Sequence, residues 1–167
     1  MFSTFTPPTG IDSNYMVAQP DLPASTKLDL DTPDELAIRS LILGIVHRTI
    51  GDYVTGRTLL NDALKHGANA EISTWVSAVA YFELAVVEMK EGERKAAERK
   101  AKLGKATSED EKGMTEWGHT FKMAREMLAE ATGLCTREMD LSSRLDSRIV
   151  MLREEIRQKM EMVGYEE

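Results

Sequence analysis

The sequence predicts an all-α fold built from two helical hairpins and a long C-terminal helix. Three observations support this prediction. Apolar residues recur at helical spacing in five segments, glycines or capping residues separate most of these segments, and one pattern of small and aromatic residues occurs twice in the same register. The chain is long enough for one domain with a modest core.

The first helix is expected to begin at Pro33, after a leader of different composition. Residues 1–31 hold four of the five prolines and show no helical periodicity, so we expect a disordered or loosely docked leader there. The Thr32 hydroxyl can cap the helix, proline suits its first position, and Glu35 can reach back to the capping residue. The helical domain is therefore expected to span residues 32–167.

Four further helices follow from their apolar periodicity, over about 53–66, 72–91, 116–132 and 141–163. Gly67 is expected to close the second helix, and Gly92 the third. Residues 93–114 are rich in Glu, Lys and Arg and have almost no apolar stripe, so they read as an insertion that is helix, loop or both. The last helix has one continuous apolar stripe, formed by Leu141, Leu145, Ile149, Leu152, Ile156, Met160 and Val163.

The spacing of small and aromatic residues identifies the hairpins as tetratricopeptide-type repeats. Such a repeat has a Leu-Gly or Leu-Ala pair within its first helix, and a Gly-acid pair and an aromatic residue before the second. Small residues let the two helices approach closely, and large residues fill the remaining space. The repeat-packing positions are Leu43, Gly44, Gly51, Tyr53, Gly56, Leu60 and Ala63 in the first copy, and Tyr81, Leu84, Ala85, Gly92, Phe121, Ala124, Leu128 and Ala131 in the second, which the charged insertion interrupts.

The first helix of each repeat is expected to line a concave groove. The candidate groove residues are Ile38, Leu41, Ile45, Val79, Phe82, Val86 and Met89. Because they are apolar, we exclude a clamp for the carboxylate tail of a chaperone, which needs Lys and Asn for charge-assisted hydrogen bonds. Two alternatives stay open. Either the C-terminal helix or an upstream domain covers the groove, or the groove binds an amphipathic helix of a partner, with Phe82 and Met89 as adaptable anchors.

Composition and charge exclude several classes of protein. A formal net charge of -7 leaves no long basic face for nucleic acid. No stretch approaches the roughly 20 apolar residues that a transmembrane helix requires. The single cysteine, Cys135, cannot form an internal disulfide, which fits a reducing compartment. We therefore expect a cytoplasmic protein, with the nucleus as a second location.

The sequence contains no arrangement typical of a catalytic or metal site. His47, His66, His119 and Cys135 lack the spacing of metal ligands, and there is no Gly-rich phosphate loop or nucleophile motif. We therefore expect a non-enzymatic protein without a cofactor. The basic stretch 94–105 could contact anionic lipid headgroups, but its interleaved acids favour a solvated face.

Three motifs carry a family resemblance. They are Leu43-Gly44-x-x-x-Arg48-x-x-Gly51-Asp52-Tyr53, Ala80-Tyr81-Phe82-Glu83-Leu84-Ala85-Val86 and Ser143-Arg144-Leu145-x-x-Arg148-Ile149. Through them, residues 33–155 resemble the C-terminal part of the fungal inclusion-body clearance protein family, which is related to the animal tetratricopeptide repeat protein 39 group. Members of that family are several times longer, and their charged segment is shorter.

The resemblance implies a role in clearing cytoplasmic protein inclusions in concert with lipid droplets, without enzymatic activity. We therefore expect a protein–protein interaction scaffold, with partners that include proteins associated with lipid droplets. Two alternatives stay open: a truncated fragment or structural subunit whose apolar groove packs on a missing domain, and a peripheral protein of lipid surfaces. Self-association also stays open, because there are few repeats and the apolar stripe of the last helix is long.

Overall fold

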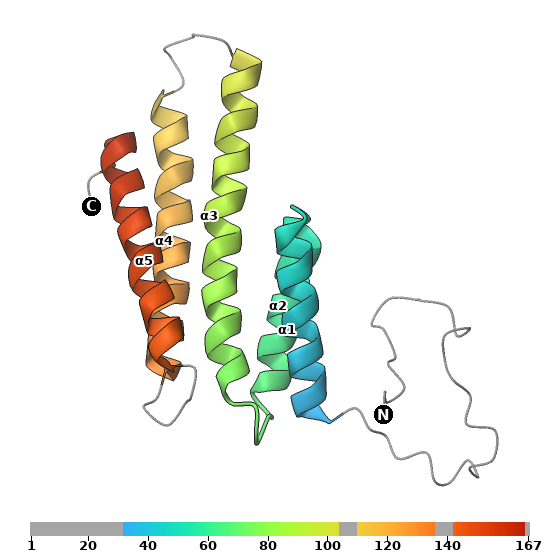
Figure 1. Ribbon diagram of the computed structural model, residues 1–167. Helices are drawn as coiled ribbons and strands as arrows, with labels where there is room; N and C mark the ends of the chain where they lie inside the picture. Colours follow the sequence, from blue (N-terminus) through green and yellow to red (C-terminus); the bar gives the residue numbers. More distant parts are fainter. Residues whose placement is uncertain (1–31, 104–109, 136–141, 166–167) are drawn as a thin grey trace, which may run out of the picture. The chain divides into compact units, whose positions relative to one another are not determined.

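A computed structural model describes residues 32–103, 110–135 and 142–165, so the expected leader lies outside the described residues. Helices are the only regular secondary structure of the described residues, which confirms the all-α class. Its helices are α1 (Pro33–Thr49), α2 (Tyr53–Gly67), α3 (Trp75–Leu103), α4 (Asp110–Leu134) and α5 (Ser142–Val163). Figure 1 shows α1 beside α2, and α3, α4 and α5 lying side by side as further antiparallel neighbours.

Each helix packs against the next one along the chain, and the odd-numbered helices also touch one another. α1 contacts α3, and α3 contacts α5, whereas α2 and α4 do not meet among the described residues. The helices α1, α3 and α5 therefore share one side of the domain. This order of contacts is that of helical hairpins stacked one after another.

The predicted end of the third helix was wrong, because α3 continues through Gly92 to Leu103. A Cβ atom added at Gly92 would lie 3.0 Å from a Thr120 methyl and 3.2 Å from the Trp117 ring, so this glycine permits close contact with α4. A single glycine costs a helix only about 1 kcal/mol. The residues that follow are mainly Ala, Glu, Lys and Arg, which favour helix. The charged segment is thus helical in all of its described residues.

The α1–α2 hairpin closes tightly because glycines face each other where its helices cross. A Cβ atom at Gly56 would lie 3.1 Å from the backbone nitrogen of Arg48 and 3.3 Å from the carbonyl oxygen of Gly44. At Gly44, the added atom would lie 2.7 Å from Cγ of Leu60, which is fully buried. The two helices therefore touch through their backbones, with Leu60 filling the space beside them.

The turn between α1 and α2 explains the Gly-acid pair of the repeat pattern. Gly51 adopts a φ of 86°, which lies in the left-handed region that glycine tolerates best. Asp52 then caps α2, because its Oδ1 accepts a hydrogen bond of 3.2 Å from the Thr55 N–H. His47 Nδ1 lies 3.0 Å from the other carboxylate oxygen of Asp52 and joins the end of α1 to this cap.

Asp34 ties the start of α1 to the connection between α2 and α3. Its carboxylate accepts hydrogen bonds from the backbone N–H groups of Glu71, Ile72 and Ser73, at 3.2, 3.1 and 2.5 Å. These bonds, the one from Ser73 above all, lower the pKa of Asp34. The carboxylate therefore fixes where α3 begins relative to α1.

The interior consists of two apolar clusters that share α3. One is built from α1, α2 and α3 around Leu41, Leu60 and Leu84, and the other from α3, α4 and α5 around Phe121 and Ile149. Two partly buried residues, Val79 of α3 and Met127 of α4, pack against both clusters. The helix α3 is thus the element on which both hairpins and the C-terminal helix depend.

The substitution Gly44→Ala tests the close crossing of α1 and α2. We expect it to lower the free energy of unfolding by about 1 kcal/mol or more, because overpacking against Leu60 costs about 1–3 kcal/mol and exceeds the gain in helix propensity. Chemical denaturation measures the change. The control is Gly133→Ala in α4, where an added Cβ meets nothing within 4 Å, so this variant should be slightly more stable than the parent.

The variant Asp34→Asn tests the carboxylate anchor through its pH dependence. Because folding lowers the pKa of Asp34, its contribution to stability is present above the unfolded pKa, about 3.9, and is lost as the pH falls through the folded pKa. Thermal unfolding should therefore give a lower Tm for Asp34→Asn at pH 6, and the two curves should converge in strong acid. Equal Tm values at pH 6 would contradict this role.

Candidate functional site

An open groove lies between α3 and α5. It has a volume of about 630 Å³. We call it the α3–α5 groove, and it is lined by Phe82, Val86, Met89 and Lys90 of α3 and by Arg148, Val150, Met151, Leu152, Glu154, Glu155 and Gln158 of α5. Most of the lining surface is apolar, which is typical of surfaces that bind other molecules.

The groove exists because α5 packs more closely on α4 than on α3. The bottom of the groove is almost inaccessible to solvent, since Phe82 and Met89 are only 4% and 1% exposed. The rim is accessible, because Val150 and Met151 are 63% and 73% exposed. A partner in this groove would therefore contact mainly Val86, Val150 and Met151, with the floor beneath them already covered by α5.

The structure brings together only part of the groove expected from the sequence. Phe82, Val86 and Met89 line the α3–α5 groove, whereas Val79 is partly buried against both apolar clusters. The α1 residues do not contribute to it. Leu41 is 2% exposed and belongs to the core of the first hairpin, against which Ile38 and Ile45 also pack.

Sequence reasoning missed the α5 wall of the groove. The apolar stripe of α5 faces inward through Leu145, Ile149, Leu152 and Ile156, as the periodicity predicts. Val150 and Met151 lie outside this stripe. The sequence did contain an indication of this wall. Two adjacent large apolar residues lie on the polar face of an amphipathic helix, where the packing of the helix does not require them.

Most of the repeat-packing residues lie where the helices meet. Most of them are buried, namely Gly44, Gly56, Leu60, Ala63, Leu84, Ala85, Phe121, Ala124, Leu128 and Ala131. Leu43, Tyr53, Tyr81 and Gly92 are partly buried, and Gly51 is exposed in its turn. Aromatic rings also pack around Phe121: the Trp117 ring stacks on it with centroids 5.2 Å apart, and the Tyr165 ring, after α5, meets it at a tilt with centroids 5.9 Å apart.

Beside the groove, a buried carboxylate joins three helices. Glu83 of α3 is 2% exposed. Its Oε2 lies 2.9 Å from Nε of Arg48 at the end of α1, and its Oε1 accepts a hydrogen bond of 2.9 Å from Nη2 of Arg148 on α5. The contact with Arg48 is an ion pair without hydrogen-bond alignment, since both of its atoms lack such a bond. We call these residues the Arg48–Glu83–Arg148 cluster.

Arg148 connects this cluster to the groove. Its guanidinium carbon lies 4.3 Å from the centroid of the Phe82 ring, so the charge rests on an aromatic face. The Arg148 side chain is nevertheless 52% exposed. Each of the three sequence motifs described above contributes one member of the cluster, Arg48, Glu83 and Arg148, although nothing in their spacing along the chain indicated that they meet.

The remaining charges of the groove are paired along its walls. Lys90 lies 2.9 Å from Glu93, and Lys159 lies 3.0 Å from Glu155. Hydrogen bonds from Arg157 and Gln158 lower the pKa of the Glu154 carboxyl to about 2. These walls therefore present little net charge to a partner.

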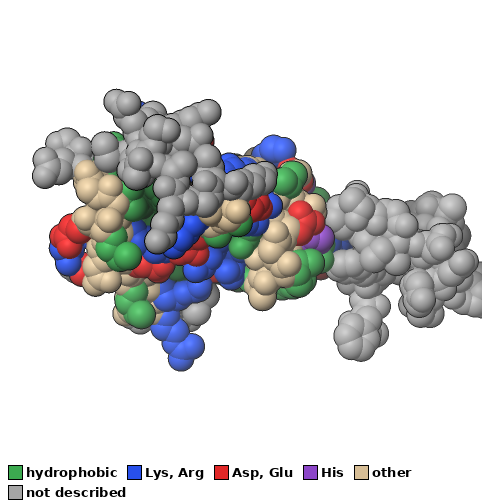
Figure 2. Space-filling model, turned by 90° about the horizontal axis from the view of Figure 1, so that it is seen from above, with side chains coloured by type: hydrophobic (Ala, Val, Ile, Leu, Met, Phe, Trp, Pro, Cys, Tyr) green, Lys and Arg blue, Asp and Glu red, His purple; other side chains and the backbone are tan. Residues whose placement is uncertain are grey.

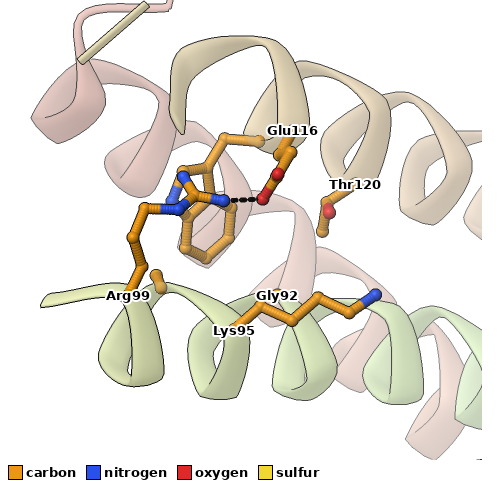
Figure 3. Close-up of a pocket in the computed structure, with 7 residues that line it drawn as sticks. Gly92, Lys95, Arg99, Glu116 and Thr120 are labelled. Carbon is orange, nitrogen blue, oxygen red and sulfur yellow. Dashed lines mark hydrogen bonds and ion pairs between the residues drawn. The ribbon is translucent and has the colours of Figure 1, made fainter. Parts of the chain in front are cut away.

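A second cavity, between the extended end of α3 and the start of α4, is too small for a ligand. Its volume is about 20 Å³, which is room for roughly one water molecule. Figure 3 shows Arg99 and Glu116 facing each other across it, joined by an ion pair, with Gly92 and Thr120 on opposite helices. This site fastens two helices and offers no space for chemistry.

Three basic residues near the end of α3 are paired with neighbouring acids. Arg94 pairs with Glu98, Lys95 with Glu91, and Arg99 with Glu116. Figure 2, which looks down on this end of the domain, shows Lys and Arg side chains interspersed with Asp and Glu. These pairs favour the solvated face over contact with anionic headgroups.

Among the residues that the structure describes, no group of three or more His, Cys, Asp and Glu side chains could hold a metal ion. Burial first, and then the nearby Asp146, raises the pKa of the Cys135 thiol. None of the described helices is both long and apolar enough to span a bilayer. The α3–α5 groove and the Arg48–Glu83–Arg148 cluster are thus the features to which a function can be attached.

Comparison with known proteins adds no relative to this picture. The chain matches no protein-family model, no curated protein and no solved structure. The resemblance to the inclusion-body clearance family consequently depends on the three motifs alone, and the function must be argued from the geometry of the groove.

The Arg48–Glu83–Arg148 cluster predicts a large effect for Arg48→Met. We expect it to lower the free energy of unfolding by about 3 kcal/mol, because the buried carboxylate is left with one half-exposed partner. Chemical denaturation measures this loss. Replacing Glu83 by Leu in the same chain should restore much of it, since the buried charge is then removed.

The matched control for Arg48→Met is Lys65→Met. Lys65 forms an exposed pair with Asp62, and such pairs contribute at most about 1 kcal/mol. If both variants unfold at the same denaturant concentration, Glu83 does not hold the three helices together as described.

Proposed function

We propose that this chain is a non-enzymatic scaffold of tetratricopeptide type, and that its α3–α5 groove binds an amphipathic helix of a partner protein. The observation that carries the proposal is the accessible apolar rim of Val150 and Met151 above an apolar floor. Large apolar side chains are exposed to water at a concave surface when they have a partner to cover them.

The arrangement of the helices supports the tetratricopeptide assignment. Each hairpin packs on the next, and the first helices of the hairpins share one side with α5, as in stacked helical repeats. The small residues expected at the hairpin crossing, Gly44 and Gly56, lie where α1 and α2 touch. In such stacks the shared side is the usual binding surface.

The spacing of the groove residues favours a helix as the bound element. Phe82, Val86 and Met89 follow one another at intervals of four and three residues, so they form a ridge along α3 over two helical turns. Phe82 and Met89 are covered by α5, so a partner helix with apolar residues at similar intervals would pack over Val86 and the exposed Val150 and Met151. Met151 adapts to partners of differing shape, because its side chain is unbranched and polarizable.

The cellular role follows from the resemblance and is part of the proposal. A scaffold of the inclusion-body clearance type would bind its partner in the cytoplasm, on inclusions or in concert with lipid droplets. The paired charges at the end of α3 make direct binding to a lipid surface the weaker alternative. The alternative of a structural subunit predicts instead that the groove is covered constitutively by a domain of the same assembly.

The variant Met151→Glu tests the groove. Met151 is 73% exposed, so the protein should fold normally and lose its partners, because a charge on the apolar rim opposes burial of the bound helix. Proximity labelling and imaging of the tagged chain, with a droplet dye and a marked misfolding-prone protein, measure partner capture and recruitment to inclusions under folding stress.

The matched control is Met162→Glu, on the same helix but outside the groove and 85% exposed. It should retain the partners and the recruitment of the unaltered chain. A Met151→Glu chain that labels the same proteins as this control would show that the groove is not the binding surface.

A further inference from the structure

We propose that the helix bound in the α3–α5 groove carries an Asp or Glu side chain that pairs with Arg148. This inference rests on the proposed function, and it specifies the chemistry of the partner. It is argued from the charge of the Arg48–Glu83–Arg148 cluster, from the orientation of the Arg148 guanidinium and from the pairing of the other charges in the groove.

The cluster holds one more positive charge than negative. Two guanidinium groups surround a single carboxylate, and arginine stays protonated in proteins. The buried partner of Glu83 is Arg48, whose side chain is 20% exposed, whereas that of Arg148 is 52% exposed. The surplus charge is therefore presented to solvent by Arg148, at the groove.

The guanidinium of Arg148 is held by two contacts. One of its N–H donors is bound to Glu83, and its central carbon lies 4.3 Å from the centroid of the Phe82 ring. A guanidinium has five N–H donors in its plane, so donors remain at its exposed edge. Because two contacts already restrict the side chain, less side-chain entropy is lost when a carboxylate accepts from that edge.

No other cation that lines the groove, among the described residues, is placed in this way. Lys90 has its own acidic partner, Glu93, three residues away on the same helix. Glu154 and Glu155 are likewise paired with Arg157 and Lys159. The Glu83 carboxylate that Arg148 contacts is shared with Arg48, so Arg148 is the position at which a partner's negative charge is favoured.

The position of Arg148 also indicates where along the partner helix its acidic residue lies. Arg148 lies against Phe82, at one end of the ridge that runs to Met89. Seven residues of helix span about 10 Å. The acidic residue of the partner should therefore lie at one end of its apolar stripe, not in the middle.

Hydrocarbon-stapled helical peptides provide a defined probe. Each has three leucines at intervals of four and three residues, and Glu, Gln or Lys is placed immediately before or after this stripe in separate peptides. Binding to the full-length chain is measured by fluorescence anisotropy. For one of the two placements, the Glu peptide should bind about tenfold more tightly than its Gln counterpart, and the difference should shrink with added salt.

The protein variants assign this preference to Arg148. In Arg148→Gln, the Glu and Gln peptides should bind equally, whereas Arg144→Gln, an exposed site on α5 outside the groove, should keep the preference. Because the first variant alters the surroundings of a buried carboxylate, Glu83→Gln combined with Arg148→Gln is measured beside it. Circular dichroism verifies that each protein is folded.

The outcomes separate the two proposals. If no leucine peptide binds, or binding survives Met151→Glu, the groove is not the binding surface and both proposals fail. If the peptides bind at the groove but Glu and Gln are equivalent, or the preference persists without Arg148, the inference about the carboxylate is overturned and the scaffold stands. Arg148-dependent binding to phosphatidylserine vesicles with no peptide preference would overturn it in favour of a lipid headgroup.

Discussion

The buried carboxylate of Glu83 is the constraint on which the arrangement of the helices depends. It lies in the first third of α3, which supplies buried residues to both apolar clusters, and it binds arginines from α1 and α5. Taking a carboxylate out of water is unfavourable unless its charge is compensated. Any arrangement that moved α1 or α5 away from α3 would leave this buried charge uncompensated, so Glu83 couples the positions of α1 and α5 to that of α3.

This coupling explains why a polar cluster occupies a place that an apolar one could fill. Apolar contacts hold helices together but are non-directional. A carboxylate between two guanidinium groups is favourable only within a narrow range of distances and angles. The weak packing of α5 on α3 leaves the groove open, and the bond from Arg148 keeps its two walls in register. A groove of defined width is what a binding surface for a helix requires.

The parts of the fold that local chemistry determines were predictable from the sequence. The cap at Asp52, the left-handed Gly51 and the stripe of α5 each follow from residues a few positions apart. The predicted end of the third helix at Gly92 was wrong, because the sequence does not distinguish a glycine that ends a helix from one that lets a neighbouring helix approach. Only the positions of Trp117 and Thr120 show that Gly92 is of the second kind. The groove was only half predicted for a similar reason: Val86 could be counted from the repeat, but its facing wall depends on how α5 crosses α3, which no local pattern records.

Affinity and specificity can be assigned to different parts of the surface. α1, the turn that follows it and the start of α2 also expose a set of apolar side chains, Ile42, Val46, Ile50 and Val54. An apolar surface can bind many partners in several registers. A charge held in place disfavours any partner that buries it without supplying an opposite charge. The α3–α5 groove combines both features, since Met151 supplies apolar area and Arg148 supplies a donor that Glu83 and Phe82 hold in place. The same carboxylate that stabilises the fold thus sets the orientation in which a partner is recognised.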